Sequence, residues 1–244
     1  PFYDNYNFLN RAIKSILNQT YKNYEIIIIN DNPKNNQNKI KNLKKKFNCK
    51  NMKIIKNKKN YGAGTSRNKG IEISKGKYIA FLDSDDTWKK NKLSTQIKVM
   101  EKYKYDATHT SYNIIDMNQN YLSSRKAKNL SYKDLLKSCD IGLSTVILKK
   151  EILKIKNPFP KLKTKEDYVL WLKILKKTSF IKGINKNLTN YRKTKNSLSS
   201  SSFVNIINGY KVYRDYMKMG IIESLYRLFI LSTNYLKKKI INDI

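Results

Sequence analysis

Short apolar runs alternate along the first half of the chain with segments whose apolar residues recur at helical spacing. The runs at 24–29, 52–55 and 78–82 are rich in β-branched or aromatic residues, as strands buried on both faces of a sheet are. The segments at 8–17 and 93–100 carry apolar residues at the spacing of amphipathic helices, and a further helix is expected over 65–74, after the glycines at 62 and 64. This alternation predicts an α/β fold with a mostly parallel sheet flanked by crossover helices.

The second half of the chain is less regular. Its pattern predicts strands near 107–115, 144–148 and 180–184 and helices near 131–137 and 167–176. From 203 to 239, apolar residues at helical spacing lie among lysines and arginines, which predicts one or two amphipathic helices. No linker divides the chain, so we expect one domain over 1–200 and a C-terminal helical region over 201–244.

Acidic side chains follow two of the predicted buried strands. Asp31 comes after the run at 24–29, and Asp83, Asp85 and Asp86 come directly after the run at 78–82. The carboxyl ends of strands line the crevice in which open α/β sheets bind ligands. Four carboxylates that converge there need a cation, and oxygen ligands without histidine or cysteine suit Mg²⁺ or Mn²⁺, completed by phosphate oxygens. An acidic turn that caps the next helix is the alternative interpretation.

Composition and charge exclude several classes of protein. Of the 244 residues 40% are hydrophobic, which supports a packed core and excludes a disordered chain. Two cysteines and one histidine exclude a disulfide framework and a Cys/His zinc site, and no apolar run is long enough to cross a bilayer. The net charge is +33, yet only six of the 51 basic residues are arginine. Lysines spread through every segment favour a compositional bias of the genome, with attraction to an anionic membrane or polyphosphate as the second interpretation.

Seven motifs resemble those of glycosyltransferase family 2, which has the GT-A fold, and they occur in the same order. The resemblance covers 1–200 and implies a nucleotide-sugar half over 1–110 and an acceptor half over 111–200. Each motif is short, and the shared order makes the resemblance specific. The matching segments are PFYDN (1–5), AIKSILNQTY (12–21), EIIIIND (25–31), NYG with SRNKG (60–70), GKYIAFLDSDDTW (76–88), KEDYVLW (165–171) and YR (191–192).

On the donor side, the resemblance implies a role for each matching residue. Tyr3 and Asp31 would hold the nucleotide base, and Arg67 would face the nucleotide. Asp83 would contact the ribose or the metal, and Asp85 would bind the divalent metal that bridges the diphosphate. Such a cation stabilises the charge that grows on a departing nucleoside diphosphate. The full implied set of residues for the nucleotide sugar is Pro1, Tyr3, Asp31, Arg67, Asp83 and Ser84.

On the acceptor side, the resemblance implies that Asp167 is the general base. A hydroxyl is a poor nucleophile until a carboxylate accepts its proton. Glu166, Tyr191 and Arg192 are candidate contacts for the acceptor or its phosphates, and Trp171 is a further candidate that fits the core better than an acceptor platform. Stabilisation of a helix N-terminus is the alternative role for Glu166 and Asp167, and a strand-end salt bridge is the alternative for Tyr191 and Arg192.

The chain departs from the family pattern at its start. The family normally has an apolar strand directly before the segment that matches 1–5, and this sequence starts where that strand would end. We therefore expect that the numbering begins within the protein. We also expect an unpaired edge or a gap in the sheet next to the strand at 25–29, and a complete sheet would contradict this.

These observations predict an inverting glycosyltransferase of bacterial surface-polysaccharide synthesis. It would move a sugar from a nucleotide-diphosphate donor, a UDP-sugar, to a hydroxyl of a glycan or lipid-linked acceptor. The alternatives are a basic nucleic-acid-binding protein, which lacks an arginine-interleaved aromatic module here, and a nucleotidyltransferase, which lacks a glycine-rich phosphate loop. We expect no specific nucleic-acid partner.

The same features predict a cytoplasmic location, and the basic region over 201–244 would rest on the inner face of the cytoplasmic membrane. Packing of that region on the catalytic domain or on a second subunit is the alternative. The sequence leaves the oligomeric state open.

Overall fold

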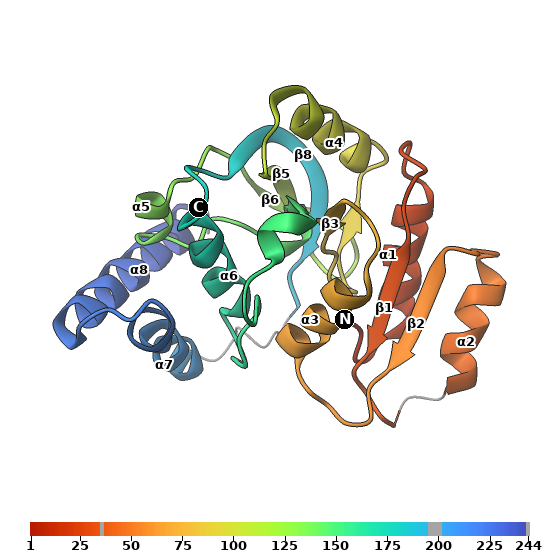
Figure 1. Ribbon diagram of the computed structural model, residues 1–244, viewed down its shortest axis with the longest axis horizontal. Helices are drawn as coiled ribbons and strands as arrows, with labels where there is room; N and C mark the ends of the chain where they lie inside the picture. The colour runs from red at the N-terminus through yellow and green to blue at the C-terminus, as the bar shows by residue number, and fades with distance from the viewer. Residues whose placement is uncertain (35–36, 195–201, 243–244) are drawn as a thin grey trace.

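The computed structural model describes residues 1–34, 37–194 and 202–242 (Figure 1). Its helices are α1 (Tyr6–Leu17), α2 (Gln37–Lys46), α3 (Ala63–Ile73), α4 (Lys92–Tyr103), α5 (Tyr132–Leu135), α6 (Glu166–Leu175), α7 (Ser202–Lys211) and α8 (Ile221–Asn242). Its strands are β1 (Ile26–Asn30), β2 (Met52–Lys56), β3 (Tyr78–Ala80), β4 (Thr87–Trp88), β5 (Ala107–Ile115), β6 (Tyr121–Arg125), β7 (Ile147–Lys149) and β8 (Lys182–Arg192). The short helices in the described parts of the chain are the 3-10 helices η1 (Leu143–Thr145) and η2 (Lys150–Leu153) and the π-helical η4 (Val212–Tyr216).

The strands form two sheets. β1 and β2 pair in parallel in a two-stranded sheet, with α2 as the crossover between them. The larger sheet has the order β3-β7-β5-β8-β4, with β6 paired to β5. Only the β5–β8 pair of this sheet is parallel, while β3–β7, β7–β5, β5–β6 and β4–β8 are antiparallel.

The predicted α/β class is confirmed, but the expectation of a mostly parallel sheet is wrong. Strands and helices alternate only as far as α4. Within this stretch, β1 and β2 are the strands that pair in parallel. After α4, strands return directly, as in the β5–β6 hairpin, and a direct return makes neighbours antiparallel. The sheet is therefore mixed, and β3 and β4 from the predicted donor half pair with β7 and β8 from the predicted acceptor half.

A slot separates the two sheets. Within the described residues, no ladder joins β1 to β3, and a cavity of about 870 Å³ lies between residues of β1, such as Ile27 and Ile29, and residues of β3. Phe2 closes one end, because its amide donates to the carbonyl of Ile29 and its carbonyl accepts from the amide of Asp31, both at 2.8 Å. The expected gap next to the strand at 25–29 is confirmed.

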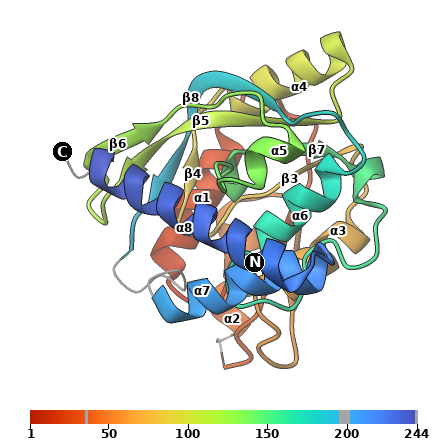
Figure 2. The same cartoon turned by 90° about the vertical axis from the view of Figure 1, so that its left-hand side faces the viewer.

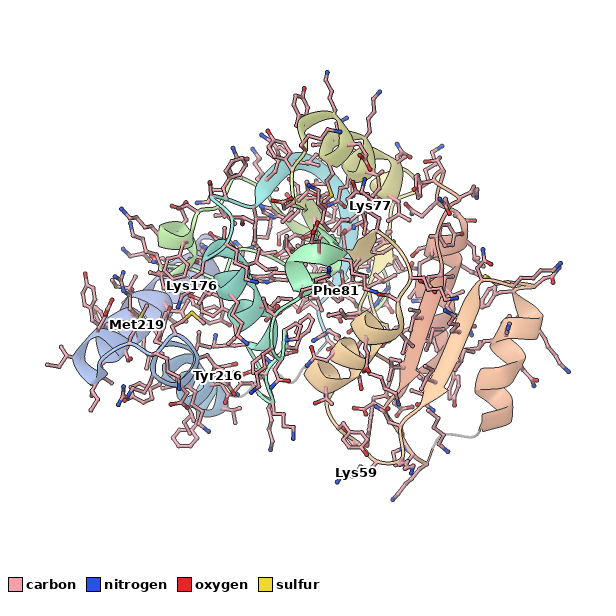
Figure 3. All side chains as sticks on the ribbon, viewed as in Figure 1. Lys59, Lys77, Phe81, Lys176, Tyr216 and Met219 are labelled. Atoms are coloured by element: carbon pink, nitrogen blue, oxygen red, sulfur yellow. The ribbon has the colours of Figure 1, made fainter. Side chains whose placement is uncertain are left out.

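Helix α6 is the centre of the main core. Its residues 168–172 are all fully buried, including Tyr168 and Trp171. Phe81, labelled near the middle of Figure 3, packs edge-to-face on Phe159 with ring centroids 5.3 Å apart. Seven buried core positions among residues 168–175 of this helix hold its N-terminal turn, where Glu166 begins the helix, in a fixed place beside the larger sheet.

Helices α7 and α8 form an outer layer on one side of the molecule, over α5 and α6 (Figure 2). They confirm the prediction of amphipathic helices after residue 203. The predicted boundary at residues 200–201 lies outside the described residues. Among the helices that the structure describes, none has the length and hydropathy needed to cross a bilayer.

The slot leads to a prediction about amide exchange in β1. The amide of Ile26 donates to the carbonyl of Asn51 on the β2 side, and strand alternation then directs the amides of Ile27 and Ile29 into the slot. In hydrogen exchange followed by NMR, we expect Ile27 and Ile29 to exchange at least about tenfold faster than Ile28, their paired neighbour. Equal protection of all three amides would contradict an open slot.

Candidate active site

Asp31, at the end of β1, organises the turn that leads into α3. It is buried, and its carboxylate accepts hydrogen bonds from the Asn57 side chain (2.7 Å) and from the amides of Tyr61 (3.0 Å) and Gly62 (2.8 Å). Gly62 has φ +87°, which glycine adopts without strain, so the turn can place its amides there. Tyr3 lies just beyond the Phe2–Asn30 bridge and is 51% exposed. The structure therefore brings Tyr3 and Asp31 to the same end of β1.

Arg67, on α3, lies buried between two carboxylates from distant segments. One guanidinium nitrogen donates to Asp83 at 2.7 Å, and another donates to Glu166 at 2.6 Å. The guanidinium also lies 5.4 Å from the centre of the Phe159 ring. The two anions raise the pKa of Arg67, so the side chain stays cationic despite its burial. Arg67 thus connects the loop after β3 to the start of α6.

The loop at 83–86 follows β3 and carries three carboxylates with different environments. Asp83 is partly exposed beside Arg67. Burial, and then the charge of Asp83, raise the pKa of Asp85 to about 6. Asp86 is fully buried, accepts hydrogen bonds from the Ser144 hydroxyl (2.6 Å) and the Arg192 amide (2.8 Å), and has a raised pKa because of burial and of Asp85. Asp86 therefore holds the loop in place, while Asp83 pairs with Arg67.

Asp167 lies in the first turn of α6, directly after Glu166. The side chain accepts a hydrogen bond from the amide of Tyr168 at 2.8 Å. Burial, and then the neighbouring charge of Glu166, raise the pKa of Asp167 to about 7. A carboxyl group with that pKa exchanges protons near neutral pH, as a general base must.

The remaining acceptor-side candidates occupy three different environments. Trp171 is fully buried in the main core, which is the environment that its core interpretation predicts. Tyr191 is 38% exposed and packs edge-to-face on Tyr112 at 6.0 Å. Arg192 is buried, and its guanidinium donates to the carbonyls of Asp85 (3.0 Å) and Asp116 (2.8 Å) instead of pairing with a carboxylate. Arg192 therefore fixes the backbone of the acidic loop.

Comparison with known proteins identifies the family. The model for "Glycosyl transferase family 2" matches residues 1–154. The chain belongs to glycosyltransferase family 2. As a family 2 glycosyltransferase it is an enzyme, and the nucleic-acid-binding and nucleotidyltransferase interpretations are set aside.

Several curated glycosyltransferases are similar over most of the chain. WfgD of Escherichia coli, a UDP-Glc:alpha-D-GlcNAc-diphosphoundecaprenol beta-1,3-glucosyltransferase, is 34% identical over 93% of this chain and 88% of its own length. WfaP of E. coli, with the same stated activity, is 40% identical over 80% of this chain and 76% of its own. TuaG of Bacillus subtilis, a putative teichuronic acid biosynthesis glycosyltransferase, is 29% identical over 98% and 95%.

The fold is also that of a solved glycosyltransferase. The structure of S. aureus TarS 1–349 in complex with UDP-GlcNAc superposes with a TM-score of 0.69 at 19% identity. The match covers 90% of this chain and 66% of that one. At this level of identity the likeness shows the fold, which is that of a GT-A enzyme.

The acidic side chains of the candidate site fit a divalent cation only in part. The described residues contain no group of three or more His, Cys, Asp or Glu side chains that could hold a metal ion, so the four acidic residues do not converge as expected. Asp31 is bound to the α3 turn, and Asp86 is bound to Ser144 and Arg192. Asp85, whose carboxyl charge is disfavoured by burial and by Asp83, remains suited to a cation that diphosphate oxygens help to hold.

Two residues of this glycosyltransferase site went unrecognised at the sequence level. Ser144 accepts a hydrogen bond from the amide of Asp83 (3.0 Å) and donates one to Asp86. Asn57 bonds both Asp31 (2.7 Å) and Ser66 (3.0 Å). Neither residue lies in a recognisable motif. Asn57 comes just after the predicted strand at 52–55 and directly after β2, as the carboxylates follow their strands, whereas Ser144 precedes β7 and carries no such signal.

The Arg67 bridge leads to a stability prediction. We expect Arg67→Gln to lower the free energy of unfolding by about 3 kcal/mol, because two partly buried carboxylates lose their cation. The control is Lys53→Gln, which removes an exposed pair with Glu25 and should cost less than about 1 kcal/mol. Urea denaturation followed by circular dichroism measures both. If the two variants lost equal stability, the bridge would have no special structural role.

Proposed function

We propose that this enzyme transfers a sugar from a UDP-sugar to a hydroxyl of a sugar carried on a lipid diphosphate, with inversion at the anomeric carbon. The stated activities of WfgD and WfaP support this donor and acceptor, and make UDP-glucose the first donor to test. The TarS complex with UDP-GlcNAc supports a UDP-sugar donor in this fold.

The observation that carries the proposal is the bridge through Arg67. It connects Asp83, from the loop proposed to contact the nucleotide sugar, with Glu166, which directly precedes Asp167. The charges of Arg67 and Asp83 also influence the pKa of Asp167. The proposed donor site and the proposed base therefore belong to one electrostatic unit, as a direct displacement between donor and acceptor requires.

Asp167 is the proposed general base. As the acceptor oxygen bonds to the anomeric carbon, its proton passes to the Asp167 carboxylate and the bond to the nucleoside diphosphate breaks. The pKa of about 7 means that the free enzyme holds the carboxylate form above neutral pH. Glu166 is committed to Arg67, so it positions the turn, while the exposed edge of Tyr191 is a candidate acceptor contact.

On the donor side, Tyr3 and Asp31 are the proposed contacts for the base of the nucleotide. An exposed Tyr3 ring at the end of β1 offers a stacking surface, and Asp31 holds the adjacent turn. Pro1 and Ser84 both line the slot beside β1 and are proposed to border the nucleotide sugar. A divalent cation held by Asp85 would stabilise the charge of the leaving diphosphate.

The raised pKa of Asp167 leads to a pH prediction. Below about pH 7 the carboxyl is protonated and cannot accept the acceptor proton, so kcat/KM should rise with pH and level off above neutrality. Asp167→Asn should lower kcat/KM by about 10²–10⁴-fold and remove this rise. The matched control is Asp106→Asn, an exposed carboxylate paired with Lys149, which should keep the wild-type profile. An unchanged pH profile in Asp167→Asn would assign the base elsewhere.

The donor site leads to a binding prediction. In calorimetric titrations, UDP should bind more tightly with Mn²⁺ than without it, and GDP and CDP should bind more weakly than UDP. Asp85→Asn should remove at least about tenfold of the Mn²⁺-dependent affinity, since one charged ligand to the cation is lost. Asp106→Asn again serves as the control. Metal-independent UDP binding in both the wild type and Asp85→Asn would refute the role of Asp85.

A further inference from the structure

Helix α8 has two faces of opposite character. The inner face packs on the enzyme through Ser224 and Leu231, which are buried, and through Asn234, whose side chain donates to the carbonyl of Lys137 at 2.9 Å. Lys238 continues this face and pairs with Asp140. These positions recur at the spacing of one side of a helix, so this inner face is the one that contacts the catalytic domain.

The outer face of α8 is apolar and faces solvent. Ile222 is 85% exposed and Phe229 is 67% exposed, and both lie on the side opposite Ser224 and Leu231. Helix α7 packs against α8 and exposes an apolar stripe of its own, in which Phe203 is 73% exposed. We call the following exposed residues the α7/α8 surface: Phe203, Ile206, Ile207, Ile221, Ile222, Leu225, Tyr226, Phe229 and Leu236.

Cations accompany the α7/α8 surface. Lys211, Arg214, Lys218 and Lys237 are all exposed on α7, on the connection to α8 or on α8 itself. The acidic residues of the same segment, 202–238, are only Asp215 and Glu223, so the segment is net positive. Helices that lie in the interface of an anionic bilayer typically expose aromatic and aliphatic side chains that are bordered by lysine and arginine.

Charge decides between a bilayer and a second copy of the chain as the occupant of this surface. The chain carries a net charge of +33, so two copies that met here would bring two strongly cationic bodies together. An anionic lipid surface instead gains about 1 kcal/mol for each nearby lysine or arginine. No described helix is suited to span a bilayer, and the lipid contact argued for is that of a helix pair lying on the surface.

The α7/α8 surface is connected to the start of α6 by short contacts. The Asn208 side chain, on the inner side of α7, donates to the hydroxyl of Thr164 at 3.0 Å, and both side chains are buried. Gly209 lies next to Lys165, the residue that precedes Glu166, and next to Leu228 of α8. The layer that carries the apolar surface therefore also supports the turn that carries the proposed base, Asp167.

We propose that the outer faces of α7 and α8 rest on an anionic lipid bilayer, with the apolar side chains below the headgroups and the flanking cations at the lipid phosphates. The arrangement fixes the start of α6 at a set height above the lipid surface, where the sugar of a lipid-diphosphate acceptor lies. This proposal rests on the proposed function for its purpose, but its test needs neither donor nor acceptor.

The test is co-sedimentation of the protein with vesicles that contain no acceptor. Wild-type protein should bind vesicles of phosphatidylcholine and phosphatidylglycerol, and should bind pure phosphatidylcholine much more weakly. Tyr226→Glu should weaken binding to the anionic vesicles by about tenfold, since it removes apolar area and adds a negative charge. Tyr103→Glu on α4 is the matched control, because Tyr103 and Tyr226 are 55% and 58% exposed and each ring lies beside a cation.

Each outcome of this test supports or overturns the proposal. Selective loss in Tyr226→Glu, with Tyr103→Glu unchanged and both melting as the wild type does, supports it. If both variants lost vesicle binding equally, the binding would depend on net charge alone and the proposal would be overturned. Absence of vesicle binding by the wild-type protein would also overturn it. If wild-type protein were dimeric in sedimentation equilibrium and Tyr226→Glu monomeric, the surface would belong to a second copy instead.

A second measurement separates this proposal from the proposed function. With a water-soluble acceptor analogue, Tyr226→Glu should transfer sugar at the wild-type rate, while with the acceptor in vesicles its KM should rise by about tenfold. Vesicle binding without any sugar transfer would refute the proposed function and leave the lipid surface standing. If wild type and Tyr226→Glu transferred sugar to the vesicle-bound acceptor with equal efficiency, the lipid surface would be refuted and the proposed function would be left standing.

Discussion

The buried guanidinium of Arg67 is the interaction on which the rest of the site depends. It joins Asp83, from the loop after β3, to Glu166, at the start of α6, and these two carboxylates are far apart in the sequence. Without a cation between them, two carboxylates at this depth would repel each other. The contact between the loop after β3 and the start of α6 would then be disfavoured. Arginine suits the position because its fork donates in two directions at once and stays charged. Lysine, although abundant in this chain, offers a single point of charge.

A second layer of polar contacts holds the acidic loop itself. Ser144 joins the amide of Asp83 to the carboxyl of Asp86, and Arg192 binds the carbonyl of Asp85 from the far side of the loop. The two residues come from η1 and β8, which belong to the larger sheet and its connections. The larger sheet and its connections thus supply the groups that hold the backbone and the buried Asp86 of the acidic loop.

The sequence pattern predicted some elements of the second half of the chain and missed others. Residues 107–115 form β5 as the pattern predicted, because five of its nine residues are β-branched or aromatic and so favour a strand. The pattern did not predict β4 or β6, because β4 has two residues and β6 has five mostly polar ones, and neither shows the alternation of apolar and polar residues that marks a strand. Strand β8 extends eight residues past its predicted end, because pairing with β5 overrides the polar sequence. The carboxylates of the site were found from their place after strands, but partners such as Ser144 are set only by the tertiary fold.

The slot between β1 and β3 has a consequence for the cooperativity of the molecule. Hydrogen-bonded strands make a sheet unfold as one unit, but the described sheets share no ladder and meet through side chains of α1, α3 and β4. The β1–β2 unit with its two helices therefore has its own small core, which includes Phe2, Ile13 and Ile28. Such a subdomain can open without disrupting the larger sheet, so we expect the end of the molecule that carries Asp31 to have a lower local stability than the end that carries Asp167.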